Sequence, residues 1–176
     1  DGAHADRAAD MVARLYADDT DTILPMTLES AELSKYASNA FLAVKLWYVN
    51  SLAELCAGVG ADITDVTGCM GADERIGPRF LAPGPGWGGS CLPKDTAALL
   101  HTGQSHGIAL REVESARSTN EAQRRRIIAT LHRTLRCPLT EVRIAVLGLT
   151  FKAGTSDIGT HPRSLSAPNL RGPVRR

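Results

Sequence analysis

The sequence predicts a mainly helical fold, in which a helical middle is flanked by remnants of two α/β domains. Three observations support this: helical spacing of apolar residues over Glu29–Val59, a short apolar segment after a helix near the start, and a strand-like segment followed by a short tail near the end. The 176 residues are 43% hydrophobic and 22% charged, with a net charge of +1. This balance is typical of a globular protein and argues against a dedicated nucleic-acid binder.

Residues 3–17 place apolar side chains at helical spacing, which predicts an amphipathic helix. Residues 21–26 are short and apolar with Pro25 near their end, which is typical of a terminal or edge strand. A helix followed at once by a strand is the tail of an α/β unit. Because one such pair cannot form a sheet, we expect residues 1–27 to be the end of a domain whose body is missing.

The middle of the chain predicts a series of helices. Apolar residues recur every three or four positions over Glu29–Val59, which predicts a long helix with a broad buried face. A short helix is expected over Asp62–Cys69, ended by glycines, and residues 75–89 are rich in proline and glycine and predict a loop. Two further helices are expected over Pro93–His101 and Glu112–Leu135.

The last part of the chain predicts a truncated α/β domain. Val142–Leu149 is apolar on both faces, which is typical of a buried parallel strand. Each added parallel strand needs a crossover of a dozen or more residues, and the short proline-rich tail after Asp157 cannot supply them. We therefore expect residues 28–136 to be an intact helical domain and residues 137–176 to be the start of the truncated domain.

The glycine-rich segment Pro83–Asp95 is the most specific feature of the sequence. Glycines let a backbone approach a ligand closely and expose N–H groups to anions. The segment leads Cys91 to the start of a helix, where the dipole and Lys94 favour the thiolate that attacks electrophiles. Asp95, one turn further on, could act as a base toward a water near the sulfur. The alternative is a buried packing cysteine beside a glycine-rich turn.

Lys35 and Asn39 form a second pair, one helical turn apart on the long helix. A cation beside an amide donor can stabilise an oxyanion or orient a water, and the alternative is a pair on a solvated face. The triplet Arg124–Arg126 is interpreted as a solvated helix face rather than a phosphate-binding patch.

The cysteines and histidines predict neither a disulfide framework nor a metal site, because they are widely spaced. We interpret Cys56, Cys69 and Cys137 as packing residues and expect reduced thiols in a cytoplasmic protein. No apolar run approaches the roughly 20 residues that a membrane helix needs, and the first residues do not form a signal peptide. No membrane partner is therefore expected.

Three segments resemble the UDP-glucose/GDP-mannose dehydrogenase family: Ser30–Ala43, Arg75–Leu81 with the G-G-S-C-L-P-K-D block, and Gly148–Lys152. They occur in the family's order, and the resemblance covers about residues 22–157. Arg75–Leu81 followed by P-G-P-G-W-G-G-S-C looks most like the branch that acts on UDP-glucose. The GDP-mannose branch usually differs before the block, and the UDP-N-acetylmannosamine branch typically carries His in place of Ser-Cys.

The resemblance implies an NAD-dependent oxidation of UDP-glucose to UDP-glucuronate in two hydride transfers. It implies that Cys91 holds the reacting carbon as a thiohemiacetal and then as a thioester. Lys35 and Asn39 would stabilise the oxyanion or orient water, and Asp95 would assist proton transfer and thioester hydrolysis. Lys94 would contact the cofactor, and no metal is implied.

The resemblance also implies a homodimer through the central helices, which form a dimerisation domain between two Rossmann-like domains. Substrate-binding residues would come from the loop, from a neighbouring subunit and from the third domain. These residues are Phe80, Leu81, Ala82, Pro83, Gly84 and Gly88 in the loop, Arg75 from the neighbouring subunit, and Phe151 and Lys152 from the third domain.

The sequence departs from the family pattern at both ends. The NAD-binding domain with its G-x-G-x-x-G turn and catalytic glutamate is absent, and Gly159 stands where an NAD-contacting arginine belongs. We therefore expect a fragment that does not bind NAD by itself, because no phosphate-cradling helix N-terminus follows a strand. The alternative functions are an inactive dimerisation and nucleotide-sugar-binding fragment, whose exposed apolar faces favour aggregation, and a GDP-mannose-type dehydrogenase.

Overall fold

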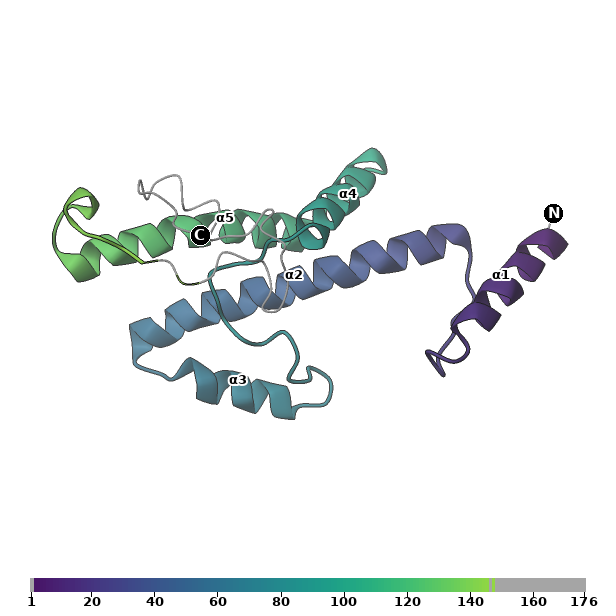
Figure 1. The fold of residues 1–176 in the computed structure, drawn as a ribbon, viewed down its shortest axis with the longest axis horizontal. Coiled ribbons are helices and arrows are strands. Elements are labelled where there is room, and N and C mark those ends of the chain that lie inside the picture. Colours follow the sequence, from purple (N-terminus) through teal and green to yellow (C-terminus); the bar gives the residue numbers. More distant parts are fainter. Residues whose placement is uncertain (1, 146, 148–176) are drawn as a thin grey trace. The chain divides into compact units, whose positions relative to one another are not determined.

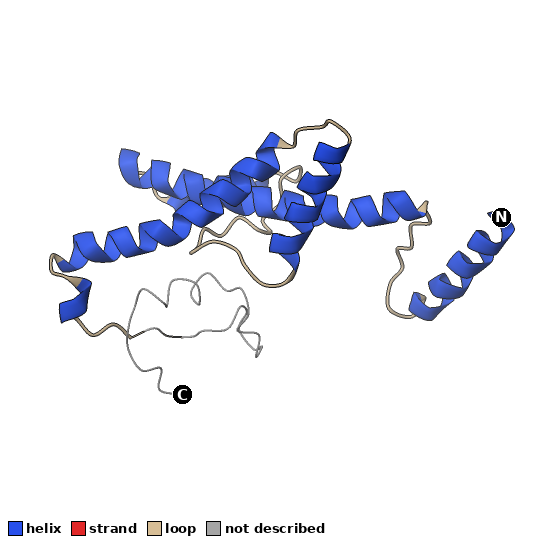
Figure 2. Cartoon of the chain, turned by 90° about the horizontal axis from the view of Figure 1, so that it is seen from above, coloured by secondary structure: helices blue, strands red, loops and turns tan. Residues whose placement is uncertain are grey.

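The computed structural model describes residues 2–145 and 147, and within them the chain is helical with no β-strand (Figures 1 and 2). The helices are α1 (Gly2–Tyr16), α2 (Leu28–Val59), α3 (Ile63–Ala72), α4 (Cys91–Ser105), α5 (Arg111–Leu135) and the short 3-10 helix η1 (Leu139–Glu141). The mainly helical fold class is confirmed. The chain divides into two units, residues 1–35 and 36–176.

The first unit contains α1 and the start of α2. Thr27 caps α2, because its hydroxyl oxygen accepts a hydrogen bond from the Ser30 backbone N–H at 3.2 Å. The prediction of a strand over residues 21–26 is wrong, since these residues have no regular secondary structure. A strand is stabilised by backbone hydrogen bonds to a neighbouring strand, and the described residues provide none.

The helices of the second unit confirm the predicted elements but not all their ends. The helix expected to stop at Gly68 and Gly71 continues through both to Ala72, because glycine weakens a helix by only about 1 kcal/mol. Helix α4 begins at Cys91, two residues earlier than predicted, and Pro93 fits in its first turn, where N–H groups lack intrahelical partners.

The strand predicted over residues 142–149 is not present in the described part of that segment. Residues 142–145 and 147 are described and adopt no strand, while 146, 148 and 149 lie outside the described residues. Phe151, Lys152 and Gly159 also lie outside them.

A small apolar cluster joins α2, α4 and α5. Ala40, Leu99 and Val113 are buried at its centre, with Tyr36 and other partly buried side chains packed around them. The turn between α4 and α5 passes close to Gly103, where a Cβ atom would lie 2.8 Å from the carbonyl oxygen of Ile108. This packing fixes the second half of α4 against α2 and α5.

Helix α2 is 32 residues long and, by length and composition alone, could cross a membrane. The sequence contains no uninterrupted apolar run of about 20 residues, and for that reason it predicts no membrane helix. Helix α2 nevertheless reaches a mean hydropathy of 1.2, with small and polar residues interspersed among its apolar ones. Asn39 and Asn50 on this helix make hydrogen bonds to other parts of the second unit. These contacts are typical of a helix packed within a helical domain.

Candidate functional site

Cys91 is the first residue of α4, and its side chain is exposed. The first backbone N–H groups of a helix lack carbonyl partners and carry partial positive charge. The Ser90 hydroxyl lies 3.8 Å from the Cys91 sulfur. An exposed thiol at a helix N-terminus is placed to react, unlike a cysteine that serves packing alone.

Asp95 lies one turn further along α4 and is fully buried. Its Oδ2 atom accepts a hydrogen bond from the Asn39 amide at 2.6 Å, and its Oδ1 atom pairs with the Lys94 ammonium at 2.5 Å. A buried carboxylate is costly unless it has such partners. The structure therefore brings together three of the site residues predicted from the sequence, on α2 and α4.

Lys35 lies one helical turn before Asn39 on α2, so the two side chains leave the same face of that helix. The Lys35 side chain is exposed, and Asn39 is half-buried. Asn39 is thus not part of a freely solvated face, because its amide is engaged by Asp95.

Amide side chains from α2 and α5 hold the glycine-rich loop at two points. The Asn50 oxygen accepts a hydrogen bond from the Gly84 N–H at 2.8 Å, and the Gln123 amide donates to the Gly84 carbonyl at 3.3 Å. Asn120 accepts from the Trp87 N–H at 2.7 Å and donates to the Trp87 carbonyl at 2.9 Å. The backbone before Cys91 is therefore fixed by helices on both sides.

Arg117 fixes the first turns of α4 to α5. Its guanidinium donates to the Pro93 carbonyl at 2.7 Å and to the Thr96 hydroxyl at 2.6 Å. Sequence reasoning missed Arg117 and the amides that hold the loop. Only Asn50 carries a signal, as a polar residue within an apolar helical stretch, whereas α5 is polar throughout and conceals its functional side chains.

The loop residues expected to bind substrate lie on both sides of the hydrogen bonds that hold the loop at Gly84 and Trp87. Phe80 has a backbone φ of 63°, which is uncommon for a bulky residue, and its ring is partly exposed. Leu81 turns into the interior, residues 82–84 are exposed, and Gly88 is buried. The chain thus presents an exposed loop segment between two anchored points.

Arg75 follows α3 and forms an ion pair with Asp73. Its Nε and Nη2 atoms bind the two carboxylate oxygens at 3.0 and 2.6 Å. The Arg75 guanidinium and N–H lower the pKa of Asp73 below its ordinary value, and the carboxylate raises the pKa of Arg75. The Arg75 side chain is 89% exposed, so it lies at the surface of this chain.

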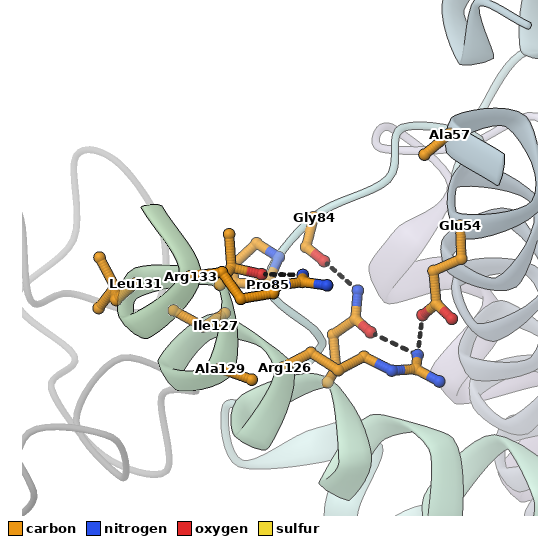
Figure 3. Close-up of a pocket in the computed structure, with 11 residues that line it drawn as sticks. Glu54, Ala57, Gly84, Pro85, Arg126, Ile127, Ala129, Leu131 and Arg133 are labelled. Atoms are coloured by element: carbon orange, nitrogen blue, oxygen red, sulfur yellow. Dashed lines mark hydrogen bonds and ion pairs between the residues drawn. The ribbon is translucent and has the colours of Figure 1, made fainter. Parts of the chain in front are cut away.

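A cleft of about 860 Å³ lies between the end of α2, the loop at Gly84 and the second half of α5 (Figure 3). Gln123 donates to the Gly84 carbonyl and accepts from Arg126, which pairs with Glu54 of α2. Arg125 and Arg126 are exposed, as a solvated helix face predicts, and Arg126 also pairs with Glu54. Cys91 does not line this cleft.

The other described cysteines differ from one another. Cys56 is buried, Cys137 is half-buried and Cys69 is exposed, so the interpretation of Cys69 as a packing residue is wrong. An exposed position on α3 leaves it without the apolar neighbours that a packing cysteine has.

The described residues contain no cluster of histidine, cysteine or carboxylate side chains that could hold a metal ion. They also contain no strand followed by a glycine turn and a helix, the arrangement that cradles a dinucleotide. Lys94, whose side chain is 58% exposed, is the predicted cofactor contact that they present. On this observation, the part of the chain that the structure describes does not fit NAD by itself.

The chain matches the UDP-glucose/GDP-mannose dehydrogenase family, central domain, over residues 29–122. It is 42% identical over 170 residues to UDP-glucose 6-dehydrogenase TuaD of Bacillus subtilis (strain 168), an alignment that covers 97% of this chain and 37% of the relative. It is 46% identical over 140 residues to UDP-glucose 6-dehydrogenase of Rhizobium meliloti (strain 1021), covering 77% and 31%.

Solved structures show the same similarity. A UDP-glucose dehydrogenase from the hyperthermophilic archaeon Pyrobaculum islandicum matches with a TM-score of 0.84 and 34% identity, over 94% of this chain and 38% of that one. A UDP-D-ManNAc dehydrogenase from Pyrococcus horikoshii matches with a TM-score of 0.79 and 26% identity, over 93% and 39%. The chain spans about a third of the length of the curated relatives described above. The chain belongs to the UDP-glucose/GDP-mannose dehydrogenase family and contains its central domain.

Proposed function

We propose that this chain is the part of a UDP-glucose 6-dehydrogenase that carries the reacting thiol, in an enzyme that oxidises UDP-glucose to UDP-glucuronate. One observation carries the proposal: the exposed Cys91 begins α4 one turn before the buried Asp95, which Asn39 and Lys94 hold. A thiol at the positive end of a helix, near a base fixed by hydrogen bonds, suits formation and hydrolysis of a thioester.

Each side chain has a defined chemical role in this proposal. The Cys91 thiolate adds to the C6 carbonyl carbon of the aldehyde, forming a C–S bond while the carbonyl electron pair moves to oxygen. The N-terminus of α4, with Lys35 and Asn39, stabilises the oxygen as it becomes negative. NAD would supply the hydride acceptor for the two oxidations, and Lys94 is the residue of this chain that would contact it.

Hydrolysis of the thioester then restores the thiol. A water oxygen adds to the thioester carbonyl carbon as the Asp95 carboxylate takes a proton from that water. The tetrahedral species expels the Cys91 sulfur and leaves a carboxylate at C6. Asn39 keeps the Asp95 carboxylate oriented for this proton transfer, because its amide donates to one carboxylate oxygen.

The remaining assignments extend this proposal by family resemblance. The loop at Phe80–Gly84, with Gly88, lines the sugar-nucleotide site in a cytoplasmic enzyme, and Lys94 contacts NAD. Phe151 and Lys152 bind substrate from the third domain. The central helical domain comprises residues 28–136, between parts of two Rossmann-like domains over 1–27 and 137–176.

We also propose a homodimer through the central helices. Phe41, Tyr48 and Leu55 are spaced seven residues apart on α2 and are 64%, 49% and 59% exposed. Residues at this spacing lie along one face of a helix, so their side chains form an apolar stripe that a second copy of α2 can cover. In this dimer, Arg75 reaches the substrate of the neighbouring subunit.

A second function is a nucleotide-sugar-binding and dimerisation fragment without turnover. One observation favours it: the described residues form no dinucleotide cradle, although they do form the loop and the thiol site. Enzyme and binding fragment differ in whether the chain transfers hydride, so one assay separates them.

The test measures NADH formation from UDP-glucose and NAD by the purified full chain, with the melting temperature measured with and without UDP-glucose. Cys91→Ser removes the proposed nucleophile, and Cys69→Ser is the matched control at another exposed cysteine. NADH formed by the unsubstituted chain and the control, but not by Cys91→Ser, supports the enzyme. A higher melting temperature with UDP-glucose but no NADH formation supports the binding fragment. If UDP-glucose gives neither NADH nor a higher melting temperature, both functions are contradicted.

A further inference from the structure

We infer that Asn120, assisted by Asn50, is a positioning residue that holds the glycine-rich loop in register with Cys91. The inference rests on the proposed function and deepens it, because the loop is the surface that the sugar nucleotide contacts in that proposal. Its basis is the set of hydrogen bonds that α2 and α5 make to the loop backbone.

Asn120 is buried and uses both ends of its amide on one residue, Trp87. Its oxygen accepts the Trp87 N–H, and its nitrogen donates to the Trp87 carbonyl, as a neighbouring strand would. The fit is close, since a Cβ atom at Gly86 would lie 2.6 Å from the Asn120 oxygen. The Asn120 side chain therefore requires a residue without a Cβ atom at position 86.

The indole of Trp87 does not fix the loop by a hydrogen bond of its own. The side chain is 6% exposed, and its Nε1 atom is buried without a hydrogen-bond partner among the described residues. The place of Trp87 is therefore set by packing and by the backbone bonds to Asn120. Removal of the Asn120 amide leaves the buried N–H and carbonyl of Trp87 without their hydrogen-bond partner. Because unsatisfied buried polar groups are costly, the loop should change its conformation.

Each of the two helices holds both the loop and the start of α4. On α2, Asn39 and Asn50 are three turns apart and bind Asp95 and Gly84, respectively. On α5, Arg117 binds the first turns of α4, and Asn120 binds the loop one turn later. Hydrogen bonds from α2 and, independently, from α5 therefore fix the position of the loop relative to the start of α4.

This arrangement predicts a split between binding and thiol reactivity. In Asn120→Ala the loop loses its attachment at Trp87, while Arg117 and Asn39 still hold the start of α4 and the Asp95 carboxylate. The affinity for UDP-glucose should therefore fall, whereas the reactivity of Cys91 should remain. Loss of overall stability would instead change both, together with the reactivity of Cys69.

The experiment uses the full chain with Trp47→Phe, so that Trp87 is the one tryptophan left. Trp87 emission reports the loop, calorimetric titration gives the Kd for UDP-glucose, and peptide-resolved alkylation gives the rates at Cys91 and Cys69. Ser115→Ala, at an exposed site on α5, is the matched control. Asn120→Asp, which keeps the acceptor, and Gln123→Ala, at a less buried contact, provide variants with smaller structural effects.

We expect Asn120→Ala to shift Trp87 emission to longer wavelength and to raise the Kd about tenfold or more, with the Cys91 alkylation rate within about twofold. Asn120→Asp and Gln123→Ala should raise the Kd less, and Ser115→Ala should change nothing. An unchanged Kd with a shifted emission, or no change in either, would overturn the inference while leaving the proposed function intact. If the unsubstituted chain does not bind UDP-glucose, the proposed function fails, and the inference fails with it.

Discussion

Asp95 illustrates at the residue scale why the candidate site needs several partners at once. A carboxylate removed from water is tolerated only where charged or hydrogen-bonding groups replace its hydration. Asn39 and Lys94 supply these groups from α2 and α4. The same contacts that hold the proposed base in place therefore also contribute to the stability of the fold.

We predict an energetic coupling between Asn39 and Asp95. Asn39→Ala should lower the free energy of unfolding by about 1–3 kcal/mol, because it leaves one oxygen of the Asp95 carboxylate buried without its partner. In the Asp95→Asn background the same substitution should cost less, with a coupling of about 0.5–3 kcal/mol. Chemical denaturation of the four proteins in the cycle measures it, and additive effects would contradict a direct interaction.

The residues of the site differ in how far sequence could identify them. Cys91 and Asp95 stand out because a glycine-rich segment and a helix start leave a local pattern in the chain. Asn120 and Arg117 leave none, because their partners, which are mostly backbone carbonyl and N–H groups, lie more than 20 residues away. A hydrogen bond to distant backbone has no residue-type signature, so only the structure identifies it.

At the scale of elements, α3 begins at a capping carboxylate. Asp62 accepts a hydrogen bond from the Thr64 N–H at 2.7 Å, which lowers the pKa of Asp62 below its ordinary value of 3.8. A lowered pKa in the folded state means that the cap stabilises α3 above the unfolded pKa. This contribution is lost as the pH falls below 3.8 through the folded pKa.

We predict that Asp62→Ala lowers the melting temperature at neutral pH and that the difference from the unsubstituted chain shrinks below pH 3.8. Asp62→Asn retains the capping oxygen without a titrating charge and should remove the pH dependence while it retains much of the stability. Thermal melts of the three proteins between neutral and acidic pH test this. A difference for Asp62→Ala that does not vary with pH would contradict the role of the charged cap.

Helical elements were predictable where periodic apolar residues mark a buried face, as in α2. Helix ends were less so, since α3 passes through two glycines whose cost is offset by its other contacts. The strands failed for a different reason. Residues 21–26 have the composition of a strand, but a strand requires a hydrogen-bonded neighbour, which lies outside what local sequence can specify.

At the scale of the whole molecule, large apolar side chains remain exposed along α2. The stripe formed by Phe41, Tyr48 and Leu55 offers a second copy of the chain a continuous surface. Burial of such a surface is favourable because it removes apolar area from water. A stable dimer requires burial of more than about 1,000 Å² in total.

We predict that the chain is a dimer in solution and that Tyr48→Glu, in the centre of the stripe, converts it to a monomer. A charge buried in an apolar interface is strongly unfavourable, so association should weaken by several orders of magnitude. Gln104→Glu, at an exposed site on α4, is the matched charge control. Light scattering during size-exclusion chromatography measures the mass, and a monomeric unsubstituted chain would contradict the proposed interface.

The central claim is that Cys91 is the reactive thiol of a UDP-glucose site, and the most direct measurement is alkylation of all four cysteines with and without UDP-glucose. Cys69 is also exposed but lies within α3, so it serves as the internal reference for accessibility. We predict that Cys91 reacts faster than Cys69 and that UDP-glucose slows only the reaction at Cys91. Equal rates at the two thiols, with no effect of UDP-glucose on either, would contradict the claim.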